Sequence, residues 1–99
     1  MTHFNGLTPA ESERLSMLAE EAAEIVQSVT KILRHGYESH HPETPTRSNR
    51  NDLENEVCDF LAVLEMFHDA EDLQIDGVQI AQSIKAKRRY THHQEDPVT

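Results

Sequence analysis

The chain has 99 residues, which suits one domain spanning residues 1–99, and its formal net charge of −9 makes it strongly acidic. An acidic surface repels nucleic-acid polymers, so a ligand with phosphates would need a metal ion or a local basic cluster. No apolar run approaches the ~20 residues that span a bilayer, and the first six residues do not resemble a secretory signal, so we expect no membrane association. The single cysteine, Cys58, excludes an intrachain disulfide and favours a reducing, cytoplasmic environment.

The first predicted helix covers residues 9–35. Thr8 can cap its N-terminus, Pro9 suits the first helical position, and Glu11 completes a capping box. Apolar residues then recur at a helical period, and Gly36 is a natural C-terminal stop. A helix of about 27 residues is roughly 40 Å long at 1.5 Å per residue, which is more than a compact monomer of this size can cover.

Two more helices are predicted after a loop. Residues 37–48 contain two prolines, which indicates a loop, and a second helix is expected over about residues 49–70. A third helix is expected over about residues 76–90, with Asp76 as its cap, and the polar tail 91–99 is expected to be frayed. No segment alternates like a strand, so the predicted fold class is all-α.

On the second predicted helix, a glutamate falls among apolar residues. At about 100° per residue, the apolar positions form one arc of Leu53, Val57, Phe60, Val63, Leu64 and Phe67. Glu56 projects inside this arc, and Asp59 lies at its edge. A carboxylate that points into a core is costly unless it is paired or bound to a metal ion. Glu56 and Asp59 are therefore candidate metal ligands.

Glu21 and Glu24 form a similar pair on the first predicted helix. Each pair has i,i+3 spacing, so its two carboxylates share a helix face and repel each other unless a cation lies between them. Taken alone, a pair such as Glu21 and Glu24 is more often solvated surface charge than a metal site. This alternative is weaker for Glu56 and Asp59, because buried charge is rare without a partner. On adjacent helices the two pairs together favour a metal site, and all-oxygen ligands point to Mg²⁺ or Mn²⁺ rather than zinc.

These acidic residues lie in two short motifs that carry a family resemblance. Residues 20–24 are Glu-Glu-Ala-Ala-Glu, and residues 56–59 are Glu-Val-Cys-Asp. Together they resemble the E-E-x-x-E and E-x-x-D signature of the MazG-like, all-α nucleoside triphosphate pyrophosphatases. The basic segments 31–36 and 85–90 are similar to those of the same family, above all of its small phage-encoded members, so the resemblance covers most of the chain. Asn55 departs from the pattern, because many members have a second acid there, and this bears on the number of metal ions.

The resemblance implies a reaction and a cofactor. Members hydrolyse a nucleoside triphosphate to the monophosphate and diphosphate with Mg²⁺, for which Mn²⁺ can substitute. Small phage members act on nucleotide pools in the host cytoplasm, with purine deoxynucleotides such as dGTP among the substrates. The residues that would hold metal ions here are Glu21, Glu24, Glu56 and Asp59. Glu20 or Glu21 would orient or deprotonate the attacking water, and the sequence does not choose between them.

Four basic residues complete the expected site. The residues that would clamp phosphate oxygens are Lys31, Arg34, Lys85 and Arg88, of which the first two would also serve catalysis. The alternative for each is a solvated helix end, where cations are favoured by the helix dipole. For the whole chain, the alternative is a non-catalytic acidic helical adaptor or interaction module whose carboxylates are surface charge. Folding that shows no response to Mg²⁺ would favour that module.

The wide apolar surface of the first predicted helix predicts an oligomer. Ala19 and Val26 extend its apolar stripe on one side, and Ile25 and Ile32 extend it on the other, so one neighbouring helix cannot cover it. We therefore expect a helical bundle completed by dimerisation, in which the long helices form a four-helix core, and which could pair again into a tetramer. In such a dimer the basic segment 85–89 would reach the partner's carboxylates and make the active site shared.

Overall fold

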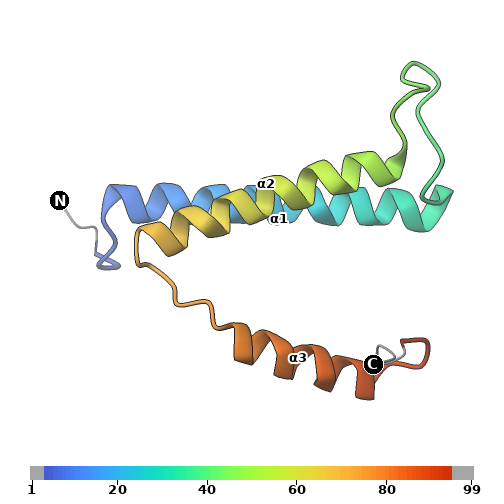
Figure 1. The fold of residues 1–99 in the computed structure, drawn as a ribbon. Coiled ribbons are helices and arrows are strands. Elements are labelled where there is room, and N and C mark those ends of the chain that lie inside the picture. Colours follow the sequence, from blue (N-terminus) through green and yellow to red (C-terminus); the bar gives the residue numbers. More distant parts are fainter. Residues whose placement is uncertain (1–3, 95–99) are drawn as a thin grey trace.

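The computed structural model describes residues 4–94 and contains three α-helices (Figure 1). Helix α1 spans Pro9–His35, α2 spans Asn49–Asp69 and α3 spans Gly77–Arg89. These bounds agree with the predicted ones to within a residue, and the described part of the chain has no strand, which confirms the all-α class. Residues 91–94 follow α3 without helical structure, and the rest of the predicted tail, 95–99, lies outside the described residues.

Local capping explains where the helices begin and end. The Thr8 hydroxyl accepts the N–H of Glu11 at 3.1 Å, and the Glu11 carboxylate accepts the N–H of Thr8 at 2.8 Å, which confirms the predicted capping box. The Asp76 carboxylate accepts the N–H of Val78 at 2.8 Å and caps α3 in the same way. Gly36 ends α1 with a φ of 88°, which an L side chain rarely adopts.

Helices α1 and α2 form an antiparallel hairpin, and the loop that joins them extends beyond its end (Figure 1). Two side chains of α2, Val63 and Phe67, make up its buried apolar core. At the same end, Arg14 binds Asp72 through two hydrogen bonds of 2.5 and 3.2 Å, which connect the start of α1 to the turn after α2. The hairpin is therefore held by a small core and a bidentate ion pair.

The predicted apolar arc of α2 is only partly buried. Val63 and Phe67 are 4% and 1% exposed, whereas Leu53, Phe60 and Leu64 are half-buried. The prediction was wrong for Val57, which is 37% exposed, because α1 covers only a part of the arc. Since one helix can cover only a limited sector of its neighbour, the rest of the arc faces away from the hairpin.

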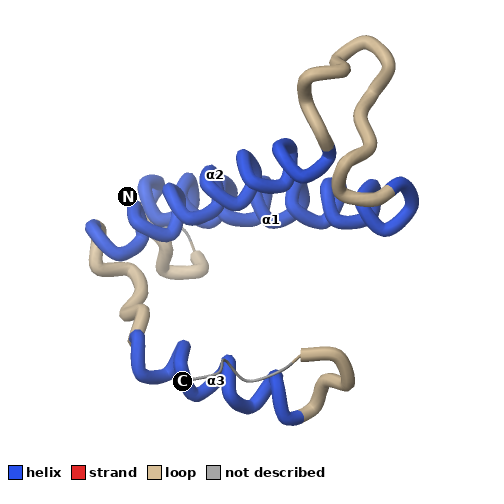
Figure 2. Tube along the Cα trace, turned by 45° about the vertical axis from the view of Figure 1, so that its right-hand side comes forward, coloured by secondary structure: helices blue, strands red, loops and turns tan. Residues whose placement is uncertain are grey.

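Helix α3 packs against neither α1 nor α2 (Figures 1 and 2). The radius of gyration is 17.4 Å, whereas a compact domain of this length has one of about 13 Å. Apolar side chains are correspondingly exposed on all three helices, among them Leu15, Val26, Leu33, Leu61, Met66, Val78, Ile80 and Ile84. A single chain thus buries little of its apolar surface.

None of the helices formed by residues 4–94 combines the length and the apolar character that a membrane crossing requires. This agrees with the sequence, in which charged residues interrupt every long apolar stretch.

Candidate metal centre

Three of the four predicted metal ligands meet at the seam between α1 and α2. Glu21 and Glu24 of α1 and Glu56 of α2 each offer a carboxylate oxygen, and these oxygens all lie within 4.8 Å of one another. We call these three residues the acidic cluster. All three side chains are half-buried, because each helix covers the face that the other presents. The i,i+3 spacing on α1 and the helical projection of α2 therefore bring these three carboxylates together, and their role as metal ligands stays a prediction.

Asp59 and Glu20 lie at the margin of the acidic cluster. Asp59 is exposed one turn further along α2 and is not among the three converging carboxylates. Its charge nevertheless raises the pKa of both Glu21 and Glu56, so it acts on the cluster through space. Glu20 is exposed as well, and it also contributes to the raised pKa of Glu21.

Two carboxyl groups of the acidic cluster have a raised pKa. For Glu21 the largest cause is desolvation by burial, followed by repulsion from Glu24 and Asp59. For Glu56 the largest cause is the hydrogen bond that its protonated form makes with the Glu24 carboxyl, followed by desolvation and the charge of Glu24. Without a cation, the cluster therefore holds protons more tightly than carboxylates in water do.

The acidic cluster also contains unsatisfied atoms. Oε2 of Glu21 and Oε2 of Glu56 are buried and accept no hydrogen bond from the described residues. None of the three carboxylates forms an ion pair with a basic side chain within residues 4–94. Buried acceptors of this kind are costly unless a partner satisfies them. A hard divalent cation such as Mg²⁺ or Mn²⁺, which prefers oxygen ligands, fits this set of donors.

A groove of about 520 Å³ links the acidic cluster to basic side chains. Its charged lining residues are Glu24, Lys31, Arg34, Arg47, Asp52 and Glu56. Lys31 and Arg34 form no ion pair with any residue that the structure describes, although carboxylates line the same groove. The structure therefore places these two predicted phosphate-binding residues beside the cluster, with their charges uncompensated by a direct contact.

Arg47 and Asp52 belong to this groove, and the site expected from the sequence did not include them. Arg47 lies in the loop before α2, and its Nε donates to Oδ1 of Asp52 at 2.5 Å. The signal for Arg47 was its place among the basic residues that flank this loop. The signal for Asp52 was its position in the first turn of α2, where an acidic side chain is favoured by the helix dipole.

Lys85 and Arg88 do not join the acidic cluster within one chain. Both lie on α3, which packs against neither helix of the hairpin (Figure 2). Together with Arg89 and Gln94 they line a separate hollow of about 320 Å³. The four expected phosphate-binding residues are thus divided between the groove and α3.

Comparisons with protein-family models, with curated proteins and with solved structures find no match to this chain.

We predict that Mg²⁺ or Mn²⁺ raises the melting temperature and that Glu56→Gln abolishes most of this rise. Metal at one hundred times its Kd would add about 2.7 kcal/mol to the free energy of unfolding, or roughly 10–20 °C for a domain of this size. Asp59→Asn should reduce the rise, because it removes a charge that acts on the cluster. Glu65→Gln is the matched control, since Glu65 is an exposed acid on the same helix. A wild-type melting curve that does not respond to either metal would contradict the site.

We also predict that the metal-free protein loses stability as the pH rises above the ordinary glutamate pKa of about 4.3. The pKa of Glu21 and of Glu56 is raised in the folded state, so above the ordinary value the unfolded chain releases protons that the folded protein keeps, and stability falls until the pH reaches the raised values. Below the ordinary value both states are protonated and the penalty disappears. Melting curves in EDTA should show a smaller pH dependence for Glu56→Gln than for the wild type. If the melting temperatures of the two proteins change equally with pH, the charges of the acidic cluster do not destabilise the fold.

Proposed function

We propose that the protein is a metal-dependent nucleoside triphosphate pyrophosphohydrolase that converts a (d)NTP and water to a (d)NMP and diphosphate. The observation that carries this proposal is the groove in which Glu24 and Glu56 lie beside Lys31 and Arg34. Carboxylates that suit a divalent cation, next to cations without an ion-pair partner, match the two needs of a polyphosphate ligand. The acidic and basic motifs that resemble the MazG-like family support the same reaction.

Each part of the groove has a chemical task in this reaction. Glu21, Glu24 and Glu56 would hold Mg²⁺, with Asp59 at the margin of the same cluster. When bound, Mg²⁺ would neutralise phosphate charge and polarise the α-phosphoryl group. Lys31 and Arg34 would bind phosphate oxygens and fix their orientation.

A proton must also leave the attacking water. A carboxylate that the metal ion does not fully engage could accept this proton, and Glu21 is one candidate at the acidic cluster. Its buried Oε2, which accepts no hydrogen bond from the described residues, is an atom that could hold the proton. Glu20 is the other candidate, and its exposed position next to Glu21 keeps it within reach of solvent.

We predict that diphosphate is the inorganic product when a panel of ribo- and deoxyribonucleoside triphosphates is incubated with Mg²⁺. The resemblance makes dGTP the first substrate to test, and ion-exchange analysis separates diphosphate from orthophosphate.

Lys31→Ala should lower kcat/KM by about 100-fold, as the loss of one group that stabilises transition-state charge typically does. Orthophosphate as the sole inorganic product would indicate a phosphatase. No turnover of any nucleotide would favour the acidic adaptor module, for which the exposed apolar side chains would supply the interaction surface.

A second part of the proposal is that the active protein is a symmetric dimer. The buried apolar core of one chain contains only Val63 and Phe67 among the described residues, which is little for a domain of this size. The exposed side chains Val26, Val29 and Leu33 of α1 would be covered if the hairpins of two chains formed a four-helix core. Two such dimers could pair further into a tetramer.

The dimer would also bring α3 to the metal centre. Lys85 lies on α3, which packs against neither α1 nor α2, and Ile80 and Ile84 on the same helix are exposed. If α3 docks on the second chain through these apolar side chains, Lys85 and Arg88 would approach that chain's groove. The active site would then be shared between two chains.

We predict a mass of at least twice 11.3 kDa in sedimentation equilibrium at micromolar concentration. The physical reason is the apolar surface that one chain leaves exposed. A mixture of inactive Glu56→Gln and inactive Lys85→Ala chains should regain some activity if sites are composite and subunits exchange. A monomer mass would contradict the dimer, and no recovery despite confirmed exchange would mean that each chain carries its own complete site.

A further inference from the structure

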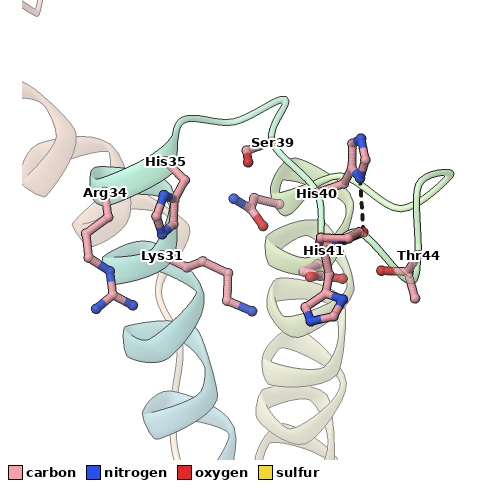
Figure 3. A pocket seen from close by; sticks show the side chains of 10 residues that line it. Lys31, Arg34, His35, Ser39, His40, His41 and Thr44 are labelled. Atoms are coloured by element: carbon pink, nitrogen blue, oxygen red, sulfur yellow. Dashed lines mark hydrogen bonds between the residues drawn. The ribbon is translucent and has the colours of Figure 1, made fainter.

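A second pocket, of about 370 Å³, lies between the loop 36–48 and the ends of the hairpin helices (Figure 3). Its lining differs from that of the groove, because neutral polar groups replace most of the charges. The uncharged or histidine side chains that line it are His35, Ser39, His40, His41, Pro42, Thr44 and Asn49. Its volume falls within the roughly 300–1,000 Å³ of small-molecule sites. This pocket is called the loop pocket below.

The loop pocket and the groove are continuous, because Lys31, Arg34 and Asp52 line both. Figure 3 shows the side chain of Lys31 extending from α1 toward the side of the loop that carries His41. The carboxylate of Asp52 forms an ion pair with Arg47, which reduces its repulsion of an anion at the junction. A ligand could therefore place its anionic part in the groove and its neutral part in the loop pocket.

Two groups in the loop pocket are available to form hydrogen bonds with a ligand. The side chain of Asn49 is more than nine-tenths buried, and its Nδ2 donates to the carbonyl of Gly36 at 3.2 Å. Its Oδ1 accepts no hydrogen bond from any residue within 4–94. Nδ1 of His41 accepts the N–H of Glu43 at 3.1 Å, so the neutral imidazole carries its proton on Nε2. The pocket thus offers an acceptor on α2 and a donor on the loop.

Backbone hydrogen bonds hold the loop in place over the pocket. The N–H groups of Asn49 and Arg50 donate to the carbonyls of Ser39 and Tyr37, each at 2.8 Å. The guanidinium of Arg50 also lies 4.2 Å from the centre of the Tyr37 ring, and its Nε donates to Glu38 at 2.8 Å. Because these contacts exist without a ligand, binding would not have to order the loop, and less affinity would be lost to ordering.

We propose that the loop pocket binds the nucleoside part of the substrate, while its α-phosphate lies at Lys31 and Arg34. This inference rests on the proposed function, and it adds a site for the base and the sugar. Oδ1 of Asn49 would accept an N–H of the base, and Nε2–H of His41 would donate to a base or sugar oxygen or nitrogen. Most of the lining away from Lys31, Arg34 and Asp52 is uncharged or histidine, which suits an uncharged nucleoside better than a further phosphate.

The test compares nucleotides with inorganic tripolyphosphate, which lacks a nucleoside, using the full-length protein and Mg²⁺. His41→Ala should raise KM for the best nucleoside triphosphate by about 10-fold, which is the loss of one hydrogen bond of about 1.4 kcal/mol. Hydrolysis of tripolyphosphate should not change. His68→Ala is the control, because His68 is an exposed histidine of α2 that does not line the loop pocket. An equal effect of His41→Ala on both substrates, or no effect on either, would overturn the proposal.

A binding measurement separates this inference from the proposed function. In NMR titrations with Mg²⁺, a nucleoside monophosphate should shift the imidazole signals of His41 but not those of His68. Tripolyphosphate should leave the His41 signals in place. These outcomes would support nucleoside binding in the loop pocket even if no triphosphate were hydrolysed. In that case only the proposed hydrolysis would be contradicted. Hydrolysis of nucleotides without any nucleoside-dependent shift at His41 would keep the reaction and reject the pocket.

Discussion

The mutual repulsion of Glu21, Glu24 and Glu56 is the constraint on which the rest of the molecule depends. These carboxylates occupy the seam between α1 and α2, which is the only helix–helix contact of the described chain. About two to three turns further along α2, Val63 and Phe67 are buried in the same seam. The hairpin therefore combines an apolar end that holds it together with an acidic section that, without a cation, opposes its closure.

This arrangement would make folding, the proposed metal binding and the proposed assembly parts of one equilibrium. A cation at the acidic cluster would remove the repulsion at the seam, and a second chain would cover the apolar surface that α3 leaves open. If each partner binds the folded hairpin and not the unfolded chain, each would stabilise the fold by mass action. The small core of the hairpin is consistent with the proposed function, because a hairpin that is marginal alone would depend on the same partners that the proposed activity requires.

Local interactions were predictable from the sequence, and long-range ones were not. The helix bounds follow from caps such as Thr8 and Gly36, and the approach of Glu56 to the first helix follows from its projection among apolar residues. The ion pair between Arg14 and Asp72 joins residues 58 positions apart, so no periodicity indicates it. The exposure of Val57 has a similar cause, because a helical projection shows which residues share a face but not how much of that face a neighbour covers.

The order of charged residues along the hairpin favours one orientation of the proposed substrate, with its nucleoside at the loop. A nucleoside in the loop pocket would place its α-phosphate at Lys31 and Arg34 and direct the β- and γ-phosphates past the acidic cluster, away from the loop. In that direction α1 has only one more basic residue, Arg14, and Asp72 already engages it. In the proposed reaction, the charge of the departing diphosphate would then have to be balanced from outside the hairpin, by metal ions or by the basic face of α3 from a second chain. The incomplete charge balance of one chain is thus a physical reason for a shared site.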